Sequence, residues 1–149
     1  TLMALSRQDV PQLRLDAAAE NLTAKGGYVI RQFKNERDVT LIATGTEVAL
    51  AVEAAEALDA EGYGVAVVSM PAWDLFDAQP EEYRAEVLGT APRIAIEAAG
   101  KFGWTRYVAS ETDVIGMPGF GASAPAERLY QGFGITMEAI IARAKALVG

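Results

Sequence analysis

The sequence predicts an α/β fold, a three-layer α/β/α sandwich around a mixed, mostly parallel sheet of five strands. After residue 26, short β-branched runs alternate with longer amphipathic segments, a pattern typical of parallel sheets covered by helices on both faces. The run Val65–Met70 is continuously apolar, as expected for a strand buried on both faces. Only about five residues join the first strand to the second, too few for a parallel crossover. We therefore expect the first strand to be antiparallel to its neighbour.

The expected strands are short and separated by turn residues. They are Tyr28–Phe33, Val39–Ala43, Val65–Met70, Ile94–Ile96 and a shorter one at Asp113–Gly116. Helices are expected between them and after the last, at Glu47–Ala60, Pro80–Leu88, Pro125–Gln131 and from Met137 onwards.

Two of these helices have clear boundaries and one apolar face each. Thr46 and Thr136 stand where an N-cap is preferred, and Gly62 and Gly64 end the first helix. The apolar face of the first helix consists of Val48, Ala51, Val52, Ala55 and Leu58. That of the last consists of Met137, Ile140, Ile141, Ala144, Leu147 and Val148, and Arg143 and Lys145 suit its negative end.

The composition excludes several classes of function. The 149 residues suit one domain, and 51% hydrophobic with 22% charged residues gives no sign of disorder. A formal charge of −7 argues against nucleic acid and against an anionic membrane as partners. Without cysteine or histidine, this chain alone forms no disulfide, thiolate nucleophile, Ser-His-Asp triad or Cys/His zinc site. No apolar run approaches the roughly 20 residues of a membrane span, so the cytoplasm is the expected compartment.

The first 25 residues are expected to lie outside the main domain. Leu2–Ser6 is a strand candidate, and residues 12–25 form a polar, alanine-rich linker that Gly26-Gly27 closes. A strand with no local partner belongs with a preceding domain, and the initial Thr1 also suggests a longer parent chain. We therefore predict two parts, residues 1–25 and residues 26–149.

Two backbone features could accept a ligand. Thr44-Gly45-Thr46 lies between a strand and a helix, where α/β folds often hold an anion. A capped tight turn is the simpler explanation, since neither the G-x-G-x-x-G nor the P-loop pattern is present. Gly116, Gly119 and Gly121 would let a ligand or partner approach closely, or they form an ordinary turn-rich connection.

The carboxylates offer two further candidates. An acidic cluster surrounds the aromatic pair Trp73 and Phe76 and consists of Asp74, Asp77, Glu81 and Glu82. Paired carboxylates there could perform acid–base chemistry or hold Mg²⁺, although such clusters more often lie in solvent at a helix start. Glu97 is a charge at the end of an apolar strand, either a perturbed functional carboxylate or one that pairs with a nearby group. Arg7 follows a strand directly, and its planar guanidinium suits a phosphate, although an arginine in that position is more often a surface or ion-pair residue.

Several blocks of the sequence resemble the carboxy-terminal domain of transketolase. The strongest are Ser6-Arg7-Gln8, the run VSMPAWDLFDAQ at residues 68–79, and FGASAPAE at residues 120–127. Ala43–Val48 and Phe133–Thr136 match further segments of that domain, so the resemblance covers nearly the whole chain. Dihydroxyacetone synthase is a close relative that shares such a domain.

The resemblance implies the role of a non-catalytic domain. Transketolases transfer a two-carbon ketol unit from a ketose phosphate to an aldose phosphate, using thiamine diphosphate and Mg²⁺ held by two upstream domains of a homodimer. It implies that residues 1 to 8 end the preceding pyrimidine-binding domain. It also implies that Arg7, with Ser6 beside it, binds the sugar phosphate. We expect this chain alone to hold no cofactor, to be inactive, and to support dimerisation and the substrate entrance.

Two alternatives come from other classes of protein. An independent module could bind a small anion at the Thr44-Gly45-Thr46 turn. A stand-alone enzyme could instead use Glu97 or the Asp74/Asp77 pair.

Overall fold

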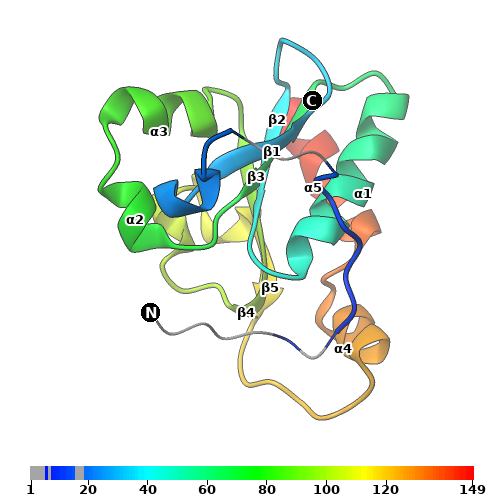
Figure 1. Cartoon of the computed structure of the whole chain (residues 1–149). Coiled ribbons are helices and arrows are strands. Elements are labelled where there is room, and N and C mark those ends of the chain that lie inside the picture. Colours follow the sequence, from blue (N-terminus) through cyan, green and yellow to red (C-terminus); the bar gives the residue numbers. More distant parts are fainter. Residues whose placement is uncertain (1–5, 7, 16–18) are drawn as a thin grey trace.

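The computed structural model describes residue 6, residues 8–15 and residues 19–149 (Figure 1). A five-stranded sheet forms the middle layer, with α1 (Glu47–Ala60) and α5 (Met137–Val148) on one face and α2 (Trp73–Asp77) and α3 (Glu81–Leu88) on the other. The α/β/α sandwich predicted from the sequence is confirmed. None of the helices in the described part of the chain combines the length and apolarity that a bilayer crossing needs.

The remaining elements complete this order. The strands are β1 (Tyr28–Gln32), β2 (Val39–Ala43), β3 (Val65–Ser69), β4 (Arg93–Gly100) and β5 (Val114–Met117). Helix α4 spans Ala126–Phe133, and three short 3₁₀ helices span Leu22–Lys25, Trp104–Arg106 and Glu111–Asp113. Every strand and helix expected after residue 26 is present. The differences are a longer β4 and a separate helix, α2, which is not among the expected helices. The strand expected at Leu2–Ser6 lies almost wholly outside the described residues.

The sheet has the strand order β1-β3-β2-β4-β5. Strand β1 runs antiparallel to β3, and the other three pairs are parallel, which confirms the predicted mixed sheet. The neighbour of β1 is β3, however, and not β2, the next strand along the chain. The connection 33–38 passes the beginning of β3, where the Phe33 amide donates to Val65 O (3.1 Å) and the Asp38 amide donates to Gly64 O (2.7 Å).

The core has two halves, one on each face of the sheet. Alternate residues of β2 separate between them: Leu41 packs with α1 and α5, whereas Ile42 packs with Phe76 and Val87 of α2 and α3. This alternation follows from the two-residue period of a strand. The predicted apolar face of α1 is confirmed, because Val48, Ala51, Val52, Ala55 and Leu58 are all buried.

The two predicted threonine caps have different outcomes. Thr136 caps α5, since its Oγ1 accepts a hydrogen bond from the Ala139 amide at 3.2 Å. Thr46 precedes α1 but makes no side-chain cap, so that prediction was wrong. Its hydroxyl lies 2.6 Å from Glu47 Oε1 and 3.2 Å from the Tyr130 hydroxyl. The backbone angles of Thr46 (φ −66°, ψ −27°) are helical and not the extended angles typical of an N-cap, and its hydroxyl donates to the Glu47 carboxylate.

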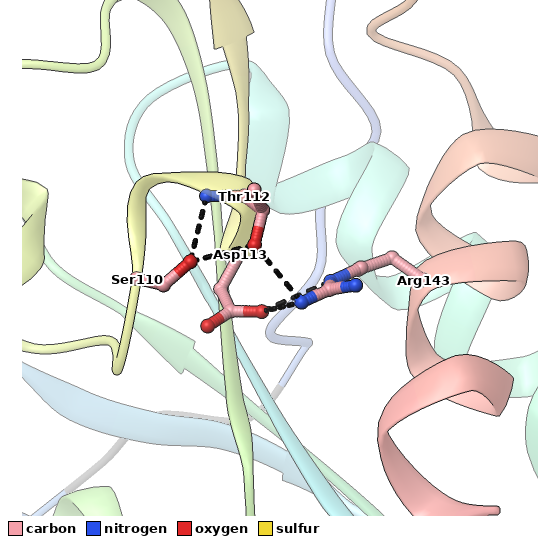
Figure 2. Close-up of polar contacts among 4 residues, drawn as sticks. All are labelled: Ser110, Thr112, Asp113 and Arg143. Atoms are coloured by element: carbon pink, nitrogen blue, oxygen red, sulfur yellow. Dashed lines mark hydrogen bonds and ion pairs between the residues drawn. The ribbon is translucent and has the colours of Figure 1, made fainter.

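A buried ion pair fixes α5 to the start of β5 (Figure 2). Arg143 donates from Nε (2.9 Å) and Nη2 (2.5 Å) to Oδ1 of Asp113, a residue only 2% exposed. Nη2 also reaches Thr112 Oγ1 at 3.1 Å, and the Ser110 Oγ accepts the Thr112 amide at 3.0 Å. We expected Arg143 to interact with the helix end, and it instead joins two elements that lie 30 residues apart.

Replacing Arg143 with Met should lower the free energy of unfolding by about 3 kcal/mol, because Asp113 would remain buried without its counter-charge. The matched control is Lys145→Met in the same helix. Lys145 pairs with Glu61 where both side chains are 40% or more exposed, so a loss of less than about 1 kcal/mol is expected. Urea unfolding of the two variants measures the difference. Equal losses would show that the Arg143–Asp113 pair contributes no more to the free energy of unfolding than the exposed Lys145–Glu61 pair.

Gly26 closes the segment before β1 in a conformation that only glycine adopts without strain. Its φ is +80°, its carbonyl accepts the Ala72 amide at 3.0 Å, and the next carbonyl, of Gly27, accepts the Tyr83 hydroxyl at 2.9 Å. A Cβ on Gly26 would lie 2.3 Å from both Ala72 O and Phe76 N, so the chain presses directly against α2 here.

Gly26→Ala should therefore destabilise the fold by at least about 3 kcal/mol, the sum of backbone strain and a steric clash with main-chain atoms. Gly134→Ala is the control, since Gly134 has φ +70° but no atom within 4 Å of the added Cβ. Strain alone predicts a loss of about 1 to 2 kcal/mol there. Thermal unfolding of both variants tests this, and an equally mild Gly26→Ala would contradict the packing argument.

Candidate functional site

A cavity of about 400 Å³ opens at the carboxyl ends of β2, β4 and β5. This edge is the usual ligand position of an open parallel sheet, because loops and helix N-termini converge there. The lining comes from the start of α1, the end of β4, the loop after β5, helix α4 and the N-terminal segment. The described lining residues are Ser6, Gln8, Thr46, Glu47, Glu97, Ala98, Met117, Gly121, Ala122, Leu129, Tyr130, Phe133 and Ile135.

The cavity brings together candidates that are far apart in the sequence. Thr46, Glu97 and Gly121 come from three separate candidate features, and Ser6 comes from the N-terminal block. Arg7 lies outside the described residues, although its neighbours Ser6 and Gln8 both line the cavity. The Asp74/Asp77 pair lies elsewhere, on α2.

Glu47 is the most buried polar group of the cavity and was missed by the sequence analysis. It is 4% exposed, and its Oε1 accepts hydrogen bonds from the hydroxyls of Thr46 and Tyr130. It is also the first residue of α1, so its carboxylate already occupies the positive end of that helix dipole. A further anion at the Thr44-Gly45-Thr46 turn would be repelled, which removes the physical basis for an anion site there.

Tyr130 joins α4 to α1 through that carboxylate. Burial and the hydrogen bond to Glu47 raise the pKa of the Tyr130 hydroxyl to about 12. The hydroxyl is therefore protonated at neutral pH and donates to Glu47. The sequence held no local signal for this contact, because the two residues lie 83 positions apart.

Glu97 is the cavity residue whose pKa is shifted into the neutral range. Burial, and next the charge of Glu47, raise the pKa of Glu97 from 4.5 to about 7, while the Trp104 side chain opposes the rise. Glu97 thus exchanges a proton near neutral pH, which agrees with the perturbed carboxylate considered from the sequence. Among the cavity residues that the structure describes, none is a lysine, arginine or histidine.

The carboxylate pair on α2 separates into two unlike groups. Asp77 accepts from Arg106 Nη1 at 2.7 Å and from the Tyr107 hydroxyl at 2.8 Å, whereas Asp74 is exposed at the start of the helix. Burial and Asp77 raise the pKa of Tyr107 to about 12, so its hydroxyl remains a donor. Asp77 therefore fastens α2 to the Trp104–Arg106 turn. Within the described ranges, no three carboxylates lie close enough together to hold a metal ion.

Glu97→Gln should remove a pH dependence of stability. The folded state holds the Glu97 proton more tightly than the unfolded state, so this contribution is complete below pH 4.5 and is lost as the pH rises to about 7. At pH 8 the variant should be more stable than the wild type by about 1 to 2 kcal/mol, after allowance for screening by solvent. At pH 4 the two should be equal.

Urea unfolding at several pH values measures this difference. Glu56→Gln, at an exposed position of α1, is the matched control and should show no such trend. Parallel pH profiles for wild type and Glu97→Gln would mean that Glu97 titrates normally.

Comparison with known proteins identifies the family of the chain. The family model described as "Transketolase-like TK C-terminal domain" matches residues 26–136. A transketolase from Sinorhizobium medicae is 52% identical over 149 residues, and one from Cereibacter sphaeroides is 54% identical over 145 residues. These alignments cover 99% and 97% of this chain but only 21% and 22% of those proteins.

Solved structures show the same relationship. A transketolase from Leishmania mexicana superimposes with a TM-score of 0.78 at 42% identity, covering 85% of this chain and 18% of that one. A transketolase from Pichia stipitis gives a TM-score of 0.81 at 35% identity, with coverages of 95% and 20%. The chain thus spans about a fifth of the length of the relatives that it matches, and it belongs to the transketolase-like TK C-terminal domain family.

Proposed function

We propose that this chain is the carboxy-terminal domain of a transketolase. The parent enzyme would transfer a two-carbon ketol unit from a ketose phosphate to an aldose phosphate. One observation carries the proposal: about half of the residues are identical to transketolases along nearly the whole chain. The same observation favours transketolase over dihydroxyacetone synthase, the related enzyme that the sequence left open.

Within that enzyme the domain is structural. Its cavity is lined by carboxylates, hydroxyls and apolar side chains, which can bind and orient but lack the groups for ketol transfer. The independent anion-binding module is not favoured, because Glu47 fills the helix end that an anion would need. The stand-alone enzyme is not favoured either, because Asp77 is already bound by Arg106 and Tyr107 and Asp74 is exposed.

The cofactors belong to the upstream part of the parent chain. Thiamine diphosphate would supply the carbanion chemistry and Mg²⁺ would bind its diphosphate. The described residues do not fit either group: they offer no cluster of metal ligands, and the cavity presents like charges to a diphosphate. We place both cofactors between the two preceding domains of a cytoplasmic homodimer.

Substrate contact is proposed for Arg7, with Ser6 beside it. Ser6 and Gln8 line the mouth of the cavity, at the edge where the loops of the sheet converge. Solved complexes of the Pichia stipitis transketolase contain sedoheptulose 7-phosphate and xylulose 5-phosphate, so phosphorylated ketoses are the expected substrate class. A guanidinium binds a phosphate through two parallel hydrogen bonds, which suits this class.

Arg7→Ala in the parent enzyme should raise the KM for phosphorylated donors by roughly 30- to 150-fold, the loss of about 2 to 3 kcal/mol of charged hydrogen bonding. The KM for unphosphorylated donors should change little. Steady-state kinetics with both donor types measures this. Arg14→Ala, an exposed arginine of the same N-terminal segment, is the control. Equal increases for both donor types would contradict phosphate binding by Arg7.

A further inference from the structure

Two loops leave the carboxyl edge of the sheet side by side and carry its most exposed aromatic residues. Gly100 of β4 and Met117 of β5 are register partners, so the loops 101–103 and 118–125 begin next to each other. We call these two segments the loop pair. Phe102 is 96% exposed and Phe120 is 100% exposed, whereas the other described phenylalanines are at least partly buried.

From these observations we propose that the loop pair docks onto the preceding part of the same polypeptide, with Phe102 and Phe120 as anchors. The inference rests on the proposed function, since it takes the upstream transketolase domains as the partner.

The turn that carries Phe102 packs closely against the aromatic core. The Trp104 amide donates to Lys101 O at 3.3 Å, and Gly103 between them has φ +87°. A Cβ on Gly103 would lie 2.8 Å from the Trp73 ring, and Trp104 is buried. The turn on which Phe102 stands is therefore fixed by the aromatic core beneath it. A large apolar side chain presented in one position is the usual form of an interface anchor.

The loop carrying Phe120 is exposed to solvent but contains no charged residue. Every residue from Pro118 to Pro125 is exposed, yet the ten residues 117–126 contain no charge in a chain that is 22% charged. Among the described residues, the backbone groups of 118–124 make no hydrogen bond. Depletion of charge, an aromatic residue and free backbone groups together suit the core of a protein interface.

The N-terminal segment identifies the partner. Ser6 and Gln8 line the same cavity as Gly121 and Ala122, and residues 8–11 share a second cavity with α4. Figure 1 shows the N-terminal segment passing α4. Whatever precedes this segment in the parent chain is therefore tethered beside the loop pair. A tether of a few residues gives a high effective concentration, which favours the same chain over a second copy.

Photo-crosslinking of the parent enzyme tests the proposal. Benzoylphenylalanine would replace Phe102 or Phe120 in turn, which keeps an aromatic side chain at each position. Leu75 on α2, 44% exposed and outside the loop pair, is the matched control position. On irradiation, positions 102 and 120 should form crosslinks to upstream residues of the same chain. The product keeps the mass of one chain on a denaturing gel, and peptide mass spectrometry identifies the partner residues.

Two results would overturn the inference. Crosslinking at 102 and 120 no stronger than at 75 would show that the loop pair is free. A product of two chains' mass would assign the surface to a second copy. Ketol transfer is assayed on the unmodified parent, so an inactive parent would refute the proposed function without affecting the crosslinking result. An active parent with free loops would refute only the docking.

Discussion

Burial of the central strands on both faces is the constraint on which the rest of the structure depends. Every residue of β2 and β3 is buried, including Thr40. Such strands need an apolar layer on each side, which the short α2 and α3 and the long α1 and α5 supply. Polar groups are therefore displaced to the ends of the sheet. At the carboxyl end Glu47, Glu97 and Tyr130 gather in one cavity.

Local chemistry explains which features could be predicted from the sequence. The apolar face of α1, the Thr136 cap and the apolar strand β3 each follow from residues within a few positions of one another, and the structure has all three. The partner of β1 could not be predicted in this way. A short connection excludes a parallel crossover, but only the packing of the whole sheet decides that β3 lies between β1 and β2.

Several residues of the cavity could be predicted from the sequence, but the hydrogen bonds and pKa shifts among them could not. Thr46, Glu97 and Gly121 were candidates for separate reasons, and the fold brings them to one cavity. The decisive group, Glu47, looked like an ordinary residue in the first turn of a helix. Its contact with Tyr130 depends on where α4 returns to the sheet, which no local pattern encodes. Thr46 has helical backbone angles and directs its hydroxyl to the same carboxylate, so the expected cap is absent.

The position of β1 separates the order of synthesis from the order of assembly. β1 is made before β2, α1 and β3, yet its strand pairing is with β3. Its hydrogen-bond ladder needs β3, the last strand of the βαβ unit from Val39 to Ser69. The first strand of the sheet therefore has no partner strand until about 30 further residues have been synthesised. Until β3 is present, the backbone N–H and C=O groups of Tyr28–Gln32 are unpaired, and another extended chain could pair with them. In the finished domain β1 covers the edge of β3 and becomes the edge of the sheet itself, so the same strand is open to foreign pairing on both sides during synthesis and on one side afterwards.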